Sequence, residues 1–201
     1  PSFDSSNNKV LIAYRHQDGP LYAIVGTVSG TGISFGSAVN SSSGAASDIS
    51  STFDTNSNKT VITFEDGGSA GKAIVATISG TSVSLGTAVT FESAEVLDTN
   101  AVFDSSNNKV VKAYKDAGNS SYGAKIKSVV GTVSGTGISF GSITELTGGE
   151  SGKISSAFDS SANKVLVAGR DSTDSNKGKV HTGTASGTSI SFETPVVFNT
   201  A

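Results

Sequence analysis

Two groups of polar residues carry the chemistry that this sequence could offer, and the first is a set of aspartates in repeated turns. Each aspartate follows a phenylalanine in the pattern FDxxxNK. Four carboxylates at equal places could converge on a cation, because hard cations select oxygen ligands. The interpretation that we favour is that each aspartate accepts backbone N–H bonds within its own turn and needs no partner from another repeat. The four residues are Asp4, Asp54, Asp104 and Asp159.

The second group follows the next apolar run of each repeat, where the copies differ from one another. An aromatic ring beside a carboxylate and a guanidinium is a combination of side chains typical of sites that bind a sugar or another small polar ligand. Loops are polar by default, so a solvated surface with tyrosines packed on strand ends is the alternative. The candidate ligand-binding residues are Arg15, His16, Tyr22, Asp66, Asp116, Tyr122, Arg170 and Asp171.

Motifs for catalysis or metal binding are missing from the sequence. The 2 histidines and the lack of cysteine exclude a His-rich or Cys-rich metal cage, and neither histidine lies in a nucleophile motif. A glycosidase needs two carboxylates about 5 to 10 Å apart, one of them with a raised pKa. Pairs such as Asp66 and Asp116 lie in hydrophilic segments that would not desolvate an acid. We therefore expect no catalytic residue, no metal and no cofactor.

Composition points to a soluble chain rich in turns. The 201 residues are 35% hydrophobic with a net charge of -3, and no apolar run is long enough to cross a bilayer. The mild acidity and the lack of a basic cluster argue against nucleic acid as a partner. The start at Pro1, with no initiator methionine and no leader, is typical of a processed chain or an excised fragment.

The positioning elements come from four repeats of about 50 residues. The phenylalanines of the FD pattern fall at Phe3, Phe53, Phe103 and Phe158. Within one copy, short segments with alternating apolar and β-branched residues are separated by turn residues, which predicts two β-hairpins in series. In the second copy the expected strands are 47–54, 59–66, 72–79 and 83–91. The asparagine of FDxxxNK and the first glycine of SGTG or SGTS suit the left-handed backbone of a tight turn.

Four antiparallel strands in each repeat match one blade of a β-propeller. We expect an all-β, four-bladed β-propeller that closes into a ring, with Pro1 near Ala201 and blades at about 1–46, 47–97, 98–152 and 153–201. The small residues of the first strands suit the axis, and the fourth strands suit the rim. A β-solenoid would need shorter coils, and a tandem β-sandwich would need about 100 residues in each domain.

Blade topology also predicts where the variable residues gather. The links after the second and fourth strands share one edge of the sheets, opposite to the turn-rich hairpins. The last interval, of 55 residues rather than 50, is explained by five extra residues in one such link of the third copy. A ligand should therefore bind on the edge that carries the links, because the near-identical turns of the opposite edge offer little that discriminates between ligands.

The segments FDSSNNKVVKAYKDAGNSSYG (103–123) and VGTVSGTGISFG (130–141) resemble the repeats of phage tail-associated and bacterial surface proteins from marine metagenomes. The likeness covers all four copies and implies a blade-like repeat in a receptor-binding or adhesive part. It implies no catalytic residue. The AYKD step reads AYRHQD, TFED and AGRD in the other copies, so a site built from it would not be equivalent in all four.

Three functions remain open at this point. The first, which we favour, is a non-catalytic, lectin-like module that binds a glycan or a cell-surface protein, extracellular or on a virion, as a monomer or within a larger multivalent assembly. The second is a glycan-active enzyme, a glycosidase or lyase, on a propeller scaffold. The third is a structural spacer. Fold cannot choose among them, and the lack of tryptophan favours weak multivalent binding over a strong lectin site.

Overall fold

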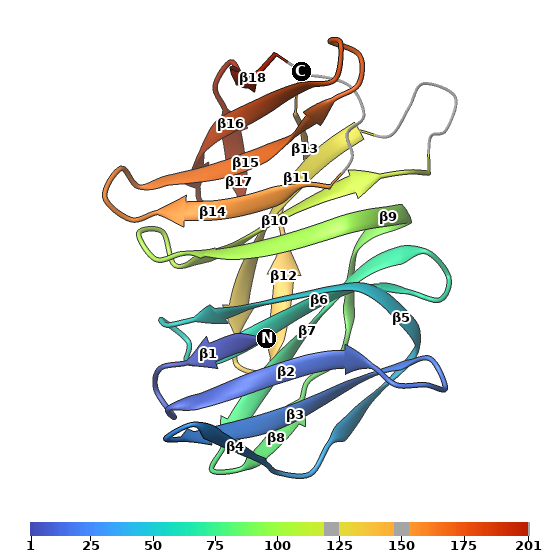
Figure 1. Cartoon of the computed structure of the whole chain (residues 1–201), viewed down its shortest axis with the longest axis vertical. Helices are drawn as coiled ribbons and strands as arrows, with labels where there is room; N and C mark the ends of the chain where they lie inside the picture. Colours follow the sequence, from blue (N-terminus) through green and yellow to red (C-terminus); the bar gives the residue numbers. More distant parts are fainter. Residues whose placement is uncertain (119–124, 147–152, 201) are drawn as a thin grey trace.

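The computed structural model describes residues 1–118, 125–146 and 153–200 as antiparallel β-strands joined by turns, and these residues contain no helix. The strands form four units with one pattern of pairing (Figure 1). Unit 1 holds β1 (Ser2–Asp4), β2 (Lys9–Arg15), β3 (Pro20–Ser29), β4 (Gly32–Phe35) and the first half of β5 (Val39–Asp54). Unit 2 holds the second half of β5, β6 (Lys59–Asp66), β7 (Ala70–Ser79), β8 (Ser82–Leu85) and the first half of β9 (Val89–Asp104).

Units 3 and 4 repeat the pattern. Unit 3 holds the second half of β9, β10 (Lys109–Asp116), β11 (Lys125–Ser134), β12 (Gly137–Phe140) and β13 (Thr144–Glu145). Unit 4 holds β14 (Ser155–Asp159), β15 (Lys164–Asp171), β16 (Lys177–Ser186), β17 (Ser189–Phe192) and β18 (Val196–Asn199). All pairs are antiparallel, as the alternating pattern predicts.

The fourth strand of each unit differs from its prediction. In unit 2 the expected strand 83–91 is interrupted: β8 pairs with Ala76–Ser79 of β7, and the start of β9 pairs with the other end of β7. β9 then continues into unit 3, where it pairs with β10. β5 links units 1 and 2 in the same way and changes its partner between Ala45 and Ala46. One covalent strand therefore belongs to two sheets at each of these two junctions.

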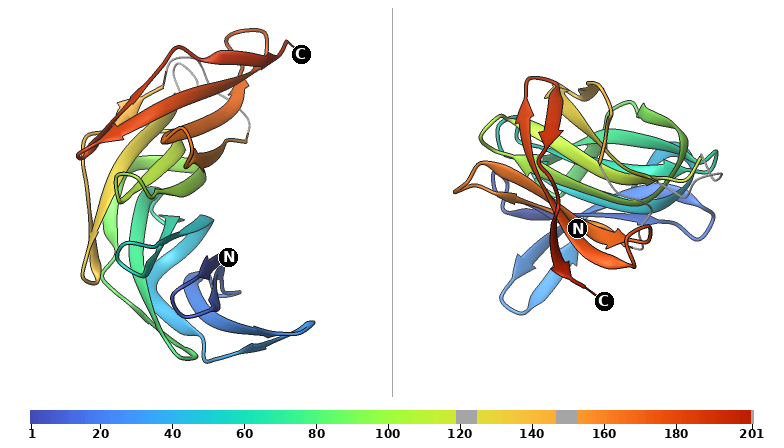
Figure 2. Two further views of the ribbon diagram at one scale, coloured as in Figure 1. Left: turned by 90° about the vertical axis from the view of Figure 1, so that its left-hand side faces the viewer. Right: turned by 90° about the horizontal axis from the view of Figure 1, so that it is seen from above.

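The four sheets stack in an arc that does not close (Figure 2). β1 lies towards one end of the arc and β18 at the other, while Ala201 falls outside the described residues. The predicted closed ring is therefore wrong, and the prediction that Pro1 lies near Ala201 falls on a residue outside the described ones. The continuous strands β5 and β9 join neighbouring units, and the four units together turn through less than a full circle (Figure 2).

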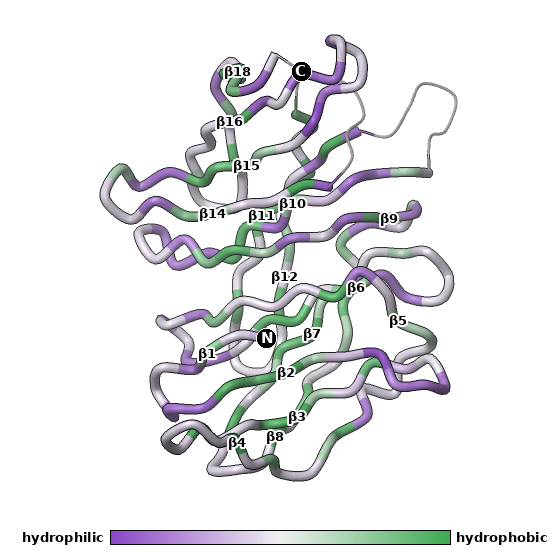
Figure 3. The backbone as a smooth tube through the Cα atoms, viewed as in Figure 1, coloured by the Kyte–Doolittle hydropathy of each residue, from purple (hydrophilic) through white to green (hydrophobic). Residues whose placement is uncertain are grey.

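Apolar layers between consecutive units form the core. Leu11, Leu21 and Val25 of unit 1 pack with Ile62 and Phe64 of unit 2. A similar cluster joins unit 2 to unit 3, and another joins unit 3 to unit 4. Figure 3 shows hydrophobic residues along the middles of the strands and hydrophilic residues at their ends. Each inner unit has two apolar faces, so we call the face that packs on the preceding unit its front and the other its back.

The turns form for the reasons that the sequence indicates. Asp104 Oδ1 accepts the N–H groups of Ser106 at 2.9 Å and Asn107 at 3.0 Å, and the other three aspartates accept the same pair of bonds. Asn108 has a φ of 53°, as Asn8 and Asn58 do. Gly30 of the first SGTG turn also has a positive φ. The predicted role of the aspartates and of the left-handed turn residues is confirmed.

Candidate functional site

The two edges of the sheets differ in kind. The turn edge carries the FDxxxNK and SGT turns, and the link edge carries the connections between the second and third strands of each unit (Figure 1). All the candidate ligand-binding residues that the structure describes lie at or near the link edge, but in four different units. Tyr122 lies outside the described residues. The candidates therefore do not form one cluster.

In units 2, 3 and 4 the candidate aspartates are held by lysines. Asp66 pairs with Lys72, Asp116 with Lys127 at 2.5 Å, and Asp171 with Lys179 at 2.7 Å. The register makes these pairs equivalent, because in each unit the residue two positions before the aspartate is the strand partner of the lysine. These residues are Phe64, Tyr114 and Gly169. The Asp–Lys pair is therefore the arrangement shared by units 2, 3 and 4.

The ion pairs fix the charge of the link edge. Burial alone would raise the pKa of Asp66, but hydrogen bonds from the Lys72 ammonium and the Gly68 N–H lower it overall. Hydrogen bonds to Asp171 and Asp174 raise the pKa of Lys179. The lowered pKa keeps the Asp66 carboxylate ionised at neutral pH. Each of the three candidate aspartates pairs with a lysine of its own unit, so the pairs leave little net charge for a ligand.

Unit 1 replaces the ion pair with rings. His16 stands where the other units have aspartate, and Tyr22 stands where they have lysine. The two rings lie 4.8 Å apart between centroids, and Tyr14 lies 6.0 Å from Tyr22. Asp18 Oδ2 lies 3.2 Å from His16 Nδ1, and the guanidinium-bearing Arg15 is exposed. Unit 1 thus gathers two of the candidate residues, His16 and Tyr22, with Tyr14 into a half-exposed aromatic cluster, whereas Arg15 pairs with Leu21 and lies on the opposite face of the sheet.

Unit 4 carries the other arginine. Arg170 is exposed and lines a cavity of about 410 Å³ together with Lys153, Asn176 and Phe198. This cavity lies on unit 4, whereas Arg15 lies on β2 of unit 1 at the other end of the arc. The two arginines of the chain therefore belong to separate surfaces.

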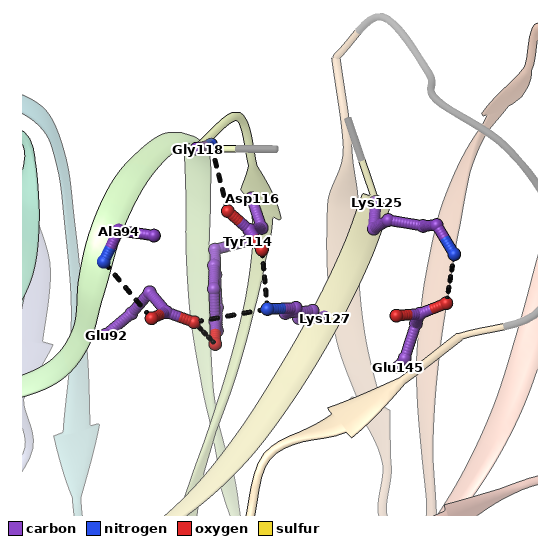
Figure 4. A network of polar contacts seen from close by, with 8 residues as sticks. All are labelled: Glu92, Ala94, Tyr114, Asp116, Gly118, Lys125, Lys127 and Glu145. Atoms are coloured by element: carbon purple, nitrogen blue, oxygen red, sulfur yellow. Dashed lines mark hydrogen bonds and ion pairs between the residues drawn. The ribbon is translucent and has the colours of Figure 1, made fainter. Parts of the chain in front are cut away.

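A polar network at the junction of units 2 and 3 was not predicted (Figure 4). Glu92 Oε2 accepts a hydrogen bond from the Tyr114 hydroxyl at 3.1 Å and lies 3.4 Å from Lys127 Nζ, which also contacts Asp116. Burial would lower the pKa of Lys127, but the bond to Asp116 and the charge of Glu92 raise it overall. Burial and the neighbouring Glu92 raise the pKa of Tyr114. Tyr114 has no exposed surface, so this network joins two units and presents no accessible nucleophile.

Lys112 is a second residue that the sequence analysis missed. It is fully buried on the front of unit 3, where units 1, 2 and 4 have Ile12, Ile62 and Val167. Its Nζ has no hydrogen-bond partner among the described residues and lies 5.9 Å from the centroid of the Phe91 ring. Burial lowers the pKa of Lys112 well below its usual range, although the charge of Asp48 opposes the shift. The sequence does contain a signal for this residue, because Lys112 is charged where the equivalent residues of the other three repeats are apolar.

The concave side of the arc holds a cavity of about 400 Å³. It is lined by the inner strands of all four units, with Ser50, Ser51, Asn100 and Ser156 among the polar residues. Two of them already join units: the Ala101 N–H donates to Ser50 Oγ at 3.1 Å, and the Ser156 N–H donates to Asn100 Oδ1 at 3.3 Å. The small residues expected at a crowded axis instead leave open space, because the arc is not closed.

Metal and membrane sites are not indicated. Among the residues that the structure describes, no group of three or more His, Asp or Glu side chains could hold a metal ion. No helix in the same residues is long and apolar enough to span a membrane.

Comparison with known proteins gives a likeness of fold only. No protein-family model matches the chain, and no curated protein matches its sequence. Among solved structures, the chain is similar to the K499G mutant of NanB sialidase from Streptococcus pneumoniae, with a TM-score of 0.57 and 16% sequence identity. The match covers 87% of this chain but only 28% of the sialidase chain. At this identity the likeness concerns the all-β fold, and it transfers neither active-site residues nor substrate.

Proposed function

We propose that the protein is a non-catalytic binding module, built from propeller-type blades in an open arc, that recognises a glycan or a surface protein in an extracellular or virion setting. The blade assignment is supported by the four repeated antiparallel units and by the likeness of fold to a stretch of a sialidase. The ligand binds at the link edge of unit 1.

One observation carries the proposal. At equivalent positions three units keep an Asp–Lys pair, whereas unit 1 has the ring of His16 tilted against the ring of Tyr22, at 4.8 Å between their centroids. The ion pair already serves the fold, so the rings of unit 1 are not needed for the same purpose. A half-exposed aromatic face suits the apolar face of a sugar.

Binding is favoured over catalysis by the burial of the most reactive polar cluster. Some sialidases use a tyrosine nucleophile, and Tyr114 with Glu92 is the tyrosine–carboxylate pair of this chain. Tyr114 is fully buried and its pKa is raised, so it is neither accessible nor readily ionised. The carboxylates Asp66 and Asp171 each pair with a lysine, and the lowered pKa of Asp66 disfavours its action as a general acid.

The test is a glycan array run beside a panel of glycosidase and lyase substrates, with the wild-type protein and the Tyr22→Ala variant. We expect weak binding to a defined set of glycans, stronger when the protein is displayed in several copies, and no turnover. Tyr22→Ala should lose the binding. Turnover of any substrate, or the same array profile for both proteins, would contradict the proposal.

A further inference from the structure

The apolar layer between units 2 and 3 contains a lysine that has no counterpart in the other layers. Lys112 lies on the front of unit 3 and is fully buried, whereas the equivalent residues Ile12, Ile62 and Val167 are apolar. An ammonium group that leaves water without gaining a partner is strongly disfavoured. This layer therefore contains a group whose charged form the closed structure does not stabilise.

The facing surface of unit 2 carries a second polar exception. Thr63 lies on the back of unit 2, where units 1 and 3 have Ala13 and Ala113. These alanines pack in the same clusters as the residues equivalent to Lys112 in the following units. Thr63 Oγ1 and Lys112 Nζ are both buried, and neither has a hydrogen-bond partner among the described residues. The two exceptions thus fall in one layer and weaken the same contact.

Other ionisable groups on the two facing surfaces do not neutralise Lys112. Ser47 donates a hydrogen bond to Glu65, Tyr114 donates one to Glu92, and Lys127 pairs with Asp116. Strands β7 and β12 contribute only uncharged side chains to this layer. The groups that face Lys112 are Asp48 of β5, Glu65 of β6, Glu92 of β9, Tyr114 and Asp116 of β10 and Lys127 of β11.

Burial gives the opening of this layer a dependence on pH. Burial lowers the pKa of Lys112 well below its ordinary 10.5, and the charge of Asp48 opposes this shift only in part. A lysine exposed by opening binds a proton at any pH up to about 10.5. Between the lowered pKa and 10.5, opening therefore takes up one proton and becomes about tenfold less favourable for each unit of rising pH.

We propose that the layer between units 2 and 3 is a pH-dependent hinge, which opens when Lys112 takes up a proton. Strand β9 runs through both units, and the bond between Tyr114 and Glu92 lies near the link edge (Figure 4). The two sheets therefore stay joined on that side and separate on the other. Opening changes the angle between the two halves of the arc, and it does not depend on the proposed ligand site.

The test uses single cysteines, because the chain has none of its own. Ala73→Cys places a thiol on the back of unit 2, in the layer of Lys112, and Ala23→Cys is the equivalent in the layer between units 1 and 2. Both alanines are fully buried, so a thiol reagent reaches either cysteine only after opening. Each rate is divided by that of an unstructured cysteine peptide at the same pH, which corrects for ionisation of the thiol.

The corrected rate for Ala73→Cys should fall as the pH rises from 7 to 10, by up to about tenfold for each unit. The rate for Ala23→Cys should not change. The range stays above the lowered pKa of the buried His181, so that residue does not titrate in it. Lys112→Ile, which copies unit 2, should slow labelling of Ala73→Cys and remove its pH dependence. Lys112→Met is a second variant that keeps an unbranched side chain.

Three outcomes would overturn the proposal. The same pH dependence for Ala73→Cys and Ala23→Cys would show that the whole chain unfolds rather than one layer. A pH dependence that persists in Lys112→Ile and Lys112→Met would assign it to another group. Labelling of Ala73→Cys at one corrected rate across the range would show that opening takes up no proton.

Discussion

The turn edge and the link edge lie at opposite ends of the same strands. The turn edge has the same contacts in all four units, whereas the link edge does not. On the turn edge four aspartates make the same two backbone hydrogen bonds in four units, and four asparagines adopt the same left-handed backbone. On the link edge three units keep an ion pair and the first replaces it with rings. A feature found in every repeat serves the fold, and a feature confined to one repeat is where a function separate from folding can lie.

Breaking the turn edge should have the largest effect on stability. Asp104 is 1% exposed, so Asp104→Ala leaves two N–H donors of its turn without their acceptor. We expect the free energy of unfolding, measured by urea denaturation, to fall by roughly 1 to 3 kcal/mol. Calcium should not change this loss. Asp159→Ala is the matched control: Asp159 is exposed, and its loss should be smaller because water can replace the carboxylate.

The ion pairs of the link edge should matter less, and they give a test in pH. Lys127→Met leaves Glu92 and Asp116 without their cation, and because Lys127 is partly exposed we expect a loss of about 1 to 2 kcal/mol at pH 7. The pKa of Lys127 is raised above its ordinary 10.5. Its contribution is therefore fully present below pH 10.5 and is lost as the pH rises through the higher folded value.

Denaturation at a series of alkaline pH values checks this prediction. The wild type and Lys127→Met should converge in stability above pH 10.5. Lys125→Met is the control, because the Lys125–Glu145 pair is exposed and should contribute less than about 1 kcal/mol. A constant difference between wild type and Lys127→Met at all pH values would show that the charge of Lys127 is not what stabilises the junction.

A buried histidine allows the stability of the interior to be tested separately from that of the two edges. His181 is 3% exposed on the front of unit 4, where the other units have Ile24, Ile74 and Val129. Burial lowers the pKa of His181 below its ordinary 6.5, with a further contribution from the charge of Lys179. The unfolded chain therefore binds the proton more readily, and stability falls as the pH drops below 6.5. His181→Val should lose less stability between pH 7 and pH 5, as followed by thermal unfolding.

The link edge of unit 1 should be the least important region for stability. Arg15→Ala with Tyr22→Ala removes exposed or half-exposed side chains, so the free energy of unfolding should change by no more than about 0.5 kcal/mol for each. Calorimetric titration with an array-selected glycan should nevertheless show weakened binding. A large fall in stability would mean that the rings serve the fold after all.

Local chemistry explains which parts of the structure could be predicted. The turns of Asp104 and Asn108 depend on a few adjacent residues, and the strands depend on apolar residues that recur at every second position. Both can therefore be predicted from the sequence of a single repeat. The angle between units is set by contacts such as Phe91 with Tyr114, at 5.2 Å between ring centroids, and by strands that cross from one sheet to the next. No single repeat encodes that angle, and the predicted ring was wrong for this reason.

The candidate site was predictable in position but not in composition. The link edge follows from blade topology, yet the partners of Asp66 and Asp116 are lysines six and eleven residues later, across links of different length. Only the register of β6 with β7 and of β10 with β11 shows that Lys72, Lys127 and Tyr22 are equivalent. That equivalence, rather than residue type, distinguishes unit 1 from the others.

An exchange of residues between units tests the central claim most directly. His16→Asp with Tyr22→Lys gives unit 1 the pair that the other three units use, and the matched control, Asp66→His with Lys72→Tyr, places rings in unit 2. Calorimetric titration with the same glycan should show at least tenfold weaker binding for the unit 1 exchange, with a melting temperature within a few degrees of the wild type. Unchanged affinity in the unit 1 exchange would contradict the account.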